Sequence, residues 1–150
     1  MTIDKITPND PRITHAYCTI NGKKWHYLDS SPPSPTPTKG TLILIHGFPD
    51  LSLAWRHQIP FLNALGFRTL ALDCMGYGET GPSPSLHDYS FKTHADAIAA
   101  LAASLGVTEV VVGGHERYVD WASIRYLLRH QIWGHSFGAK ENLIALLMSY

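Results

Sequence analysis

A short turn motif combines residue types that can stabilise negative charge on a substrate. His46-Gly47-Phe48-Pro49 directly follows an apolar run at residues 41–45. Glycine lets the backbone turn sharply and proline fixes the next φ angle, so the amide of Phe48 can face a cleft. One backbone amide aimed at a developing oxyanion stabilises a transition state by about 3–4 kcal/mol. The motif is a candidate oxyanion site, and a plain strand-to-helix turn is the alternative interpretation.

A second motif offers a nucleophile. Residues 134–138 read Gly-His-Ser-Phe-Gly, which fits the G-x-S-x-G elbow of serine esterases with Ser136 as the nucleophile. This elbow requires a strand directly before it and a helix after it. Residues 139–148 are compatible with a helix, whereas residues 125–133 are typical of a helix or loop rather than of a strand. Ser136 is therefore a candidate on its motif alone, and a surface turn is the alternative.

The strands predicted around these motifs form a mostly parallel sheet. Residues 13–20 and 23–28 predict a hairpin, because Asn21-Gly22 between them suits a type I′ turn. Three continuous apolar runs predict strands buried on both faces: residues 41–45, 67–72 and 107–112.

Two segments between the buried strands have helical spacing. The first, residues 53–65, has Asp50 or Ser52 as its predicted cap and Gly66 as its terminator. The second follows Ser90, which is its predicted cap, and runs to about residue 105. Alternating strands and helices indicate a parallel sheet with right-handed crossovers, and such sheets bind ligands beyond the carboxyl ends of their strands. The oxyanion motif lies at one of those ends.

Four motifs occur in an order that characterises one family. They are residues 45–50, residues 55–60, residues 72–80 and residues 111–115, which read IHGFPD, WRHQIP, LDCMGYGET and VVGGH. Over residues 8–115 they resemble the opening of an α/β-hydrolase of the epoxide hydrolase group. The resemblance implies a partial α/β-hydrolase fold, in which an N-terminal β-hairpin precedes a three-layer α/β/α sandwich with a mostly parallel sheet. On this interpretation the later strands and the cap domain are missing.

The resemblance also implies a mechanism. A carboxylate at the nucleophile elbow attacks an epoxide carbon to form an ester, and two tyrosines of the cap polarise the epoxide oxygen. A later histidine, paired with an acid, activates the water that hydrolyses the ester. The amide of Phe48 and the amide after the nucleophile would hold the oxyanion. His46, Gly47, Pro49 and His115 would line the same pocket.

The chain departs from the family at the elbow itself. The family continues Gly-His-Asp-Trp-Gly-Gly, whereas this chain has Glu116 at the aspartate position and Tyr118 at the position of the next glycine. An elbow is a strained turn that needs small neighbours, and glutamate is one methylene longer than aspartate. Glu116, Ser136 and no working nucleophile at all stay open as alternatives. By the resemblance, the acid and the histidine that either nucleophile needs lie after residue 150.

Two further residues of the family motifs have a structural and a functional interpretation. We expect Trp55 to pack in the core rather than to act beside the site. We expect Asp73, at the end of the second buried strand, to shape the loop at residues 76–78 rather than to do chemistry.

The composition excludes several classes of function. Twelve basic residues balance twelve acidic ones, which predicts no nucleic-acid or anionic membrane partner. The N-terminus is polar and the two cysteines, Cys18 and Cys74, fall in different elements, so a soluble, cytoplasmic protein is expected. Of the nine histidines, His46 and His115 belong to loop motifs, and the other seven lie in elements that give them no reason to converge. None of their pairs has a carboxylate or cysteine at ligand spacing. The sequence therefore predicts neither a metal site nor a cofactor.

These observations support one favoured function and two alternatives. Residues 1–115 are predicted to be the first part of an α/β-hydrolase domain with a proline-rich loop at residues 30–40. Residues 116–150 are a divergent segment whose order stays open. The favoured hypothesis is an epoxide hydrolase-like hydrolase, truncated and inactive alone, whose substrate is a small epoxide or ester. The alternatives are a small serine esterase that uses Ser136, and a non-catalytic fragment that self-associates through an exposed sheet edge.

Overall fold

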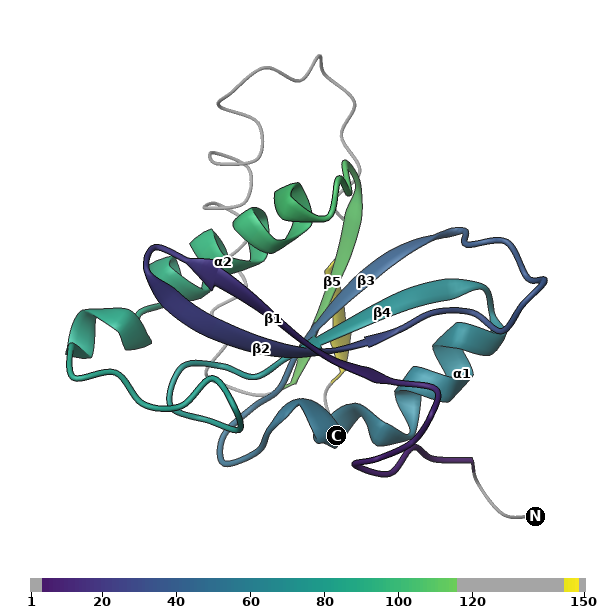
Figure 1. Ribbon diagram of the computed structural model, residues 1–150, viewed down its shortest axis with the longest axis horizontal. Coiled ribbons are helices and arrows are strands. Elements are labelled where there is room, and N and C mark those ends of the chain that lie inside the picture. Colours follow the sequence, from purple (N-terminus) through teal and green to yellow (C-terminus); the bar gives the residue numbers. More distant parts are fainter. Residues whose placement is uncertain (1–3, 116–144, 149–150) are drawn as a thin grey trace.

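One mixed sheet organises the residues that the computed structural model describes, which are residues 4–115 and 145–148 (Figure 1). Its six strands stand in the order β1-β2-β4-β3-β5-β6. β4, β3, β5 and β6 run parallel to one another, and β2 is antiparallel to both β1 and β4. The strand bounds are β1 Thr14–Ile20, β2 Lys23–Ser30, β3 Gly40–Ile45, β4 Phe67–Leu72, β5 Val110–His115 and β6 Ala145–Met148.

The predicted hairpin is confirmed and is part of the main sheet. Asn21 and Gly22 both have positive φ angles, 51° and 75°, as a type I′ turn requires. β2 continues to Ser30 because its second half pairs with β4, from Tyr27 opposite Leu72 onwards. The proline-rich loop between β2 and β3 connects the hairpin to the first buried strand.

The first predicted helix is divided into two shorter ones. A 3₁₀ helix, η1, spans Ser52–Arg56, and α1 spans Gln58–Ala64. The cap prediction was wrong, because Leu51 occupies the N-cap of η1 and makes no side-chain capping bond. Pro60 stands in the first turn of α1, where a helix needs no backbone N–H donor. Gly66 ends this segment as predicted, with a φ angle of 95°.

The second predicted helix is confirmed, and its end explains a shift of the next strand. After the short 3₁₀ helix η2, Leu86–Tyr89, helix α2 spans Phe91–Ser104 and the Ser90 side chain accepts a hydrogen bond from the backbone N–H of Thr93. The backbone N–H of Val107 donates to the carbonyl of Ala102 at 2.9 Å, which completes the helix C-terminal turn. Val107 therefore belongs to the helix end. The strand predicted at residues 107–112 begins and ends three residues later, as β5, Val110–His115.

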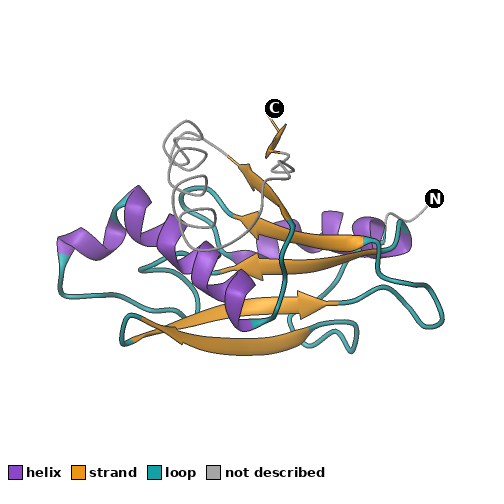
Figure 2. Cartoon of the chain, turned by 90° about the horizontal axis from the view of Figure 1, so that it is seen from above, coloured by secondary structure: helices purple, strands orange, loops and turns teal. Residues whose placement is uncertain are grey.

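The two faces of the sheet carry separate cores, which confirms the three-layer sandwich. α2 packs on one face and α1 with η1 packs on the other (Figures 1 and 2). Alternate residues of β3 divide between the faces: Ile43 and Ile45 join the α2 side, while Leu42 and Leu44 join the α1 side. Trp55 of η1 is 4% exposed within the second core, so its prediction as a core residue is confirmed.

β6 corrects the helix expected at residues 139–148. Residues 145–148 pair in parallel with β5, from Ala145 opposite Val112 to Met148 opposite His115. Their apolar run is short and has no clear period, so hydrogen bonding to the free side of β5 decides its conformation over helix propensity. β5 is therefore paired on this side along four residues.

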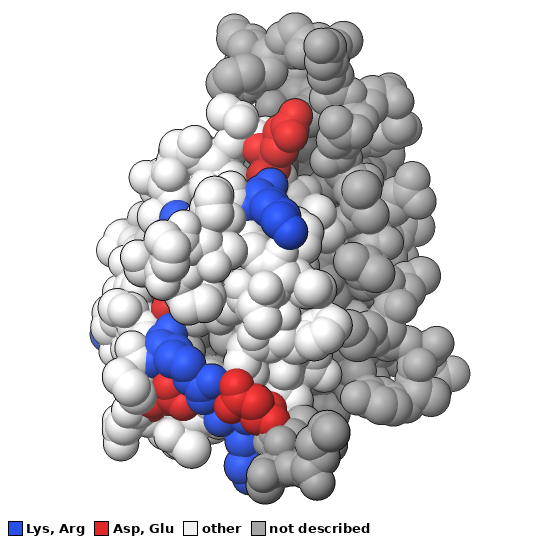
Figure 3. Space-filling model, turned by 90° about the vertical axis from the view of Figure 1, so that its right-hand side faces the viewer, with Lys and Arg blue, Asp and Glu red and all other residues white. Residues whose placement is uncertain are grey.

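Charged residues of the described segments occur as mixed pairs. Arg12 contacts Asp4 and Asp10, and Arg68 pairs with Asp29 through two hydrogen bonds. Blue and red side chains accordingly lie beside one another on the face in Figure 3. Among the described helices, none has the length and apolar character needed to cross a bilayer.

Candidate active site

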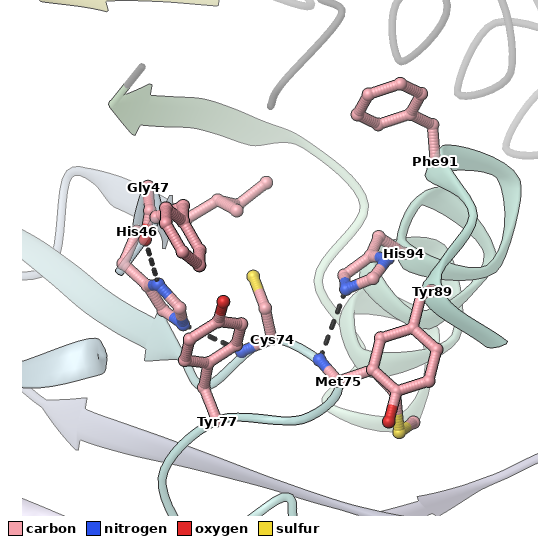
Figure 4. Close-up of a pocket in the computed structure, with 10 residues that line it drawn as sticks. His46, Gly47, Cys74, Met75, Tyr77, Tyr89, Phe91 and His94 are labelled. Atoms are coloured by element: carbon pink, nitrogen blue, oxygen red, sulfur yellow. Dashed lines mark hydrogen bonds between the residues drawn. The ribbon is translucent and has the colours of Figure 1, made fainter. Parts of the chain in front are cut away.

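A cavity of about 250 Å³ lies where β3 and β4 end (Figure 4). The segment after β3 forms one wall, the segment after β4 forms the floor, and η2 with the start of α2 forms the opposite wall. This is the edge of the sheet at which the alternating pattern predicts ligand binding. The lining residues are Ile45, His46, Gly47, Phe48, Cys74, Met75, Tyr77, Tyr89, Phe91 and His94.

His46 connects the oxyanion motif to the floor of this cavity. Its Nδ1 lies 2.8 Å from the carbonyl oxygen of Gly47, which can only accept, so Nδ1 carries the proton. Its Nε2 accepts a hydrogen bond from the backbone N–H of Cys74 at 3.0 Å. Burial lowers the pKa of His46, so the ring stays neutral. Because both ring nitrogens are used, His46 positions the backbone and is not a general base.

Two hydrogen bonds fix the orientation of the peptide that follows β3. The carbonyl of Gly47 accepts hydrogen bonds from the His46 ring and from the backbone N–H of Asp50 at 3.1 Å. The Gly47–Phe48 peptide is trans, so its N–H points in the opposite direction from this carbonyl. The next peptide, Phe48–Pro49, is cis. The Phe48 amide is thereby directed away from His46, and the Phe48 ring, 54% exposed, forms part of the cavity wall.

His94 repeats the arrangement of His46 from the other side of the floor. Its Nδ1–H donates to the carbonyl of Ser90 at 2.9 Å, and its Nε2 accepts from the backbone N–H of Met75 at 3.2 Å. Burial lowers the pKa of His94 as well. Two neutral rings therefore hold the successive amides of Cys74 and Met75. The sequence analysis missed His94; its position one turn after the Ser90 cap places it at the helix end nearest the cavity.

The remaining lining residues give the cavity an apolar, aromatic character. The Tyr77 ring lies edge-on to His46, with centroids 5.2 Å apart, and to Phe48 at 6.3 Å. Burial raises the pKa of Cys74 to about 12, so its thiol is protonated and is no nucleophile. The described part of the cavity is thus suited to an apolar molecule.

Asp73 shapes the loop after β4, as predicted. Its carboxylate accepts from the His26 ring at 2.6 Å, from Ser52 N at 2.7 Å and from Glu79 N at 3.0 Å. Burial raises the pKa of Asp73, but these hydrogen bonds outweigh burial and lower it to about 2. Gly78 has a φ angle of 48°, and a Cβ built there would stand 1.9 Å from the Asp73 carboxylate. Only glycine allows the loop to close around this group.

The two candidate nucleophiles, Glu116 and Ser136, lie outside the described residues. His115 is the last residue of β5, and only its backbone is described. β6 occupies four of the residues that the serine elbow needs as a helix. The roles of these three residues stay predictions.

One prediction about histidines was wrong, because His15 and His26 do converge. The Asn21-Gly22 turn sets a register in which His15 lies opposite Leu28 and Tyr17 lies opposite His26. His15 and His26 are therefore diagonal neighbours on one face of the hairpin, 2.9 Å apart between Nδ1 and Nε2, and Glu79 lies beside them. The turn motif, read as a register, would have found the pair; no sequence signal indicates Glu79.

Sequence comparison agrees with this architecture. The model of the family described as alpha/beta hydrolase fold matches residues 40–116, half of the chain. The chain belongs to the alpha/beta hydrolase fold family.

Relatives of this chain include epoxide hydrolases. Epoxide hydrolase srdG of Neurospora crassa is 48% identical over 97 residues, covering 61% of this chain and 28% of that protein. Bifunctional epoxide hydrolase 2 of Rattus norvegicus is 33% identical over 120 residues, covering 79% of this chain and 19% of that protein. The resemblance to the epoxide hydrolase group is confirmed, and the chain is epoxide hydrolase-like by homology.

Solved structures give the same assignment. An epoxide hydrolase from an endophytic Streptomyces superposes with a TM-score of 0.66 at 28% identity, and the match covers 81% of the present chain and 34% of the Streptomyces chain. Epoxide hydrolase VrEH1 from Vigna radiata superposes with a TM-score of 0.62 at 34% identity, over 78% and 35%. The chain spans about a third or less of the length of each of these relatives.

Proposed function

We propose that this chain contributes the oxyanion-binding part of an enzyme that hydrolyses a small epoxide through a covalent ester. The observation that carries the proposal is the orientation of one peptide. The Gly47 carbonyl is held by His46 and by Asp50 N, so the Phe48 N–H faces the other way, at the carboxyl edge of the sheet. When water attacks the carbonyl carbon of the ester, the carbonyl oxygen becomes an oxyanion, and an amide directed at that oxygen stabilises it.

The surroundings of this amide support an apolar substrate. The cavity beside it is lined by aromatic side chains and by the buried thiol of Cys74. Its histidines are neutral and fully hydrogen-bonded, so they add no charge. His115 ends β5, and Glu116 follows it in the sequence at the position where the family pattern has its nucleophile. A carboxylate attack therefore remains the chemistry that we assign to this position.

A chimeric enzyme tests the amide. Residues 40–115 would replace the matching segment of a complete epoxide hydrolase, such as the Neurospora crassa relative, and diol formation from styrene oxide would be measured. Phe48→Pro removes the N–H and should lower kcat by about 100- to 1000-fold. Phe48→Ala removes the ring but keeps the amide, and it should retain most of kcat. Equal kcat values for the two folded variants would refute the oxyanion role.

The 150-residue chain alone tests the second part of the proposal, that it is inactive by itself. We expect no diol, because the resemblance assigns the water-activating histidine and its acid to later strands. Diol formation that disappears in Glu116→Ala or in Ser136→Ala would overturn this expectation and identify the nucleophile. Labelling by a fluorophosphonate that is lost in Ser136→Ala would favour the serine esterase instead.

A further inference from the structure

A cluster of metal-ligand side chains lies on the hairpin, outside the cavity. His15 of β1, His26 of β2 and Glu79 of the loop after β4 each offer one ligand atom, and the three atoms lie within 4.8 Å of one another. We propose that these three side chains bind one divalent transition-metal ion, with zinc as the preferred ion among those that favour imidazole and carboxylate ligands.

The hydrogen bonds on the far sides of the two rings carry this proposal. His26 Nδ1 lies 2.6 Å from the ionised Asp73 carboxylate, which can only accept, so this nitrogen carries the proton. His15 Nε2 lies 2.9 Å from the carbonyl oxygen of Pro8, which also can only accept. In the neutral rings, the other nitrogens, His15 Nδ1 and His26 Nε2, are therefore both unprotonated.

These two unprotonated nitrogens face each other at 2.9 Å. Two lone pairs at this distance repel unless a cation lies between or beside them. The cation is either one shared proton or a metal ion, and the neighbouring carboxylate favours the divalent charge. His26 is 2% exposed, so the repulsion cannot be relieved by turning this ring into water.

The separations of the ligand atoms suit a tetrahedral ion. Bonds of about 2.0–2.1 Å to zinc separate neighbouring ligand atoms by about 3.3 Å. The nitrogens are 2.9 Å apart, and Glu79 Oε1 lies 3.4 Å from His15 Nδ1 and 3.9 Å from His26 Nε2. Side-chain shifts of a few tenths of an ångström therefore bring the three atoms to the expected geometry.

The surroundings orient each ligand. Asp73 holds His26 in the way that carboxylates hold metal-bound histidines. The hydroxyl of Tyr17 donates to Glu79 Oε2, which leaves Oε1 facing the histidines. The side chains of His15 and Glu79 are 38% and 51% exposed, which leaves a path for the ion and a fourth position for water.

Calorimetric titration of zinc sulfate into the metal-free 150-residue chain tests the proposal. We expect one zinc ion per chain, with affinity lowered at least about 100-fold in His15→Gln and in Glu79→Gln. Both positions are partly exposed, so these variants should fold. His87→Gln, which changes an exposed histidine in η2, is the matched control and should bind zinc as the parent chain does. Cobalt in place of zinc should give the visible absorption of a tetrahedral ion.

Two results would overturn the proposal. The first is a folded parent chain that takes up no zinc in excess, which would leave a shared proton as the cation between the histidines. The second is zinc binding of equal strength in the parent and in both ligand variants, which would assign the ion to other residues.

Discussion

Replacing Asp73 by asparagine should remove the interaction that joins the hairpin, η1 and the loop after β4. The carboxyl has a pKa of about 2 in the folded chain against an ordinary value of 3.8, and a difference of this size corresponds to about 2.5 kcal/mol of folding free energy at neutral pH. Asparagine also presents an NH₂ group to donors that the carboxylate accepts, which leaves a buried N–H unpaired at about 1–3 kcal/mol. We expect Asp73→Asn to lower the free energy of unfolding by about 3–5 kcal/mol.

The pH dependence of this loss gives a sharper test than its size. Because folding lowers the pKa of Asp73, its ionisation stabilises the fold above the unfolded value of 3.8, and this contribution is lost as pH falls towards 2. The difference between the parent and Asp73→Asn should therefore be constant near neutral pH and narrow between about pH 4 and pH 2.

Urea unfolding, followed by the fluorescence of the buried Trp25 and Trp55, measures both quantities. Asp50→Asn is the matched control, since Asp50 is exposed and its Oδ1 accepts from the adjacent Leu51 N at 2.9 Å. This control should change the free energy of unfolding by less than about 0.5 kcal/mol. A loss in Asp73→Asn no larger than that of the control, or one that stays constant down to pH 2, would refute the reasoning.

Two further perturbations follow from the same loop. Gly78→Ala should destabilise the fold more than Gly81→Ala. Both glycines have positive φ angles, but of the two only Gly78 has a neighbour within reach of an added Cβ, the Asp73 carboxylate at 1.9 Å. Equal urea midpoints for the two variants would contradict this expectation. Cys74 should react with a maleimide only when the chain unfolds, because burial raises the pKa of its thiol to about 12. The half-buried Cys18 should react first. Rapid labelling of a folded Cys18→Ala variant would contradict this expectation, because it would show that the Cys74 thiol is accessible.

The sequence predicts most elements correctly where a pattern is local. The continuous apolar run at residues 67–72 is β4 with the same bounds, and Ser90 caps α2 as its type suggests. The start of β5 was misplaced because the apolar Val107 satisfies a helix-end hydrogen bond, which a composition pattern does not distinguish from a strand. Residues 145–148 were misassigned for a related reason: their partner strand is some thirty residues earlier in the chain.

The site was predictable only in its location. A parallel sheet requires residues 46–49 to stand at its ligand-binding edge, and His46, Gly47 and Phe48 do line the cavity. The partners of His46 and Asp73 are 28 and 47 residues away, so no local pattern reveals that these side chains hold backbone amides and a histidine. The His15–His26 pair shows the opposite case, because a two-residue turn fixes its register from the sequence alone.

The floor of the cavity keeps its structure only while the rings of His46 and His94 are neutral. His46 and His94 each accept a hydrogen bond from one of two successive amides, and a protonated ring cannot accept. Burial lowers the pKa of both rings below the unfolded value of 6.5. Their contribution to the free energy of unfolding is therefore present at neutral and alkaline pH and is lost as the pH falls below 6.5. Acidification would thus remove both hydrogen bonds that hold the Cys74–Met75 segment, and the floor of the cavity would lose its shape.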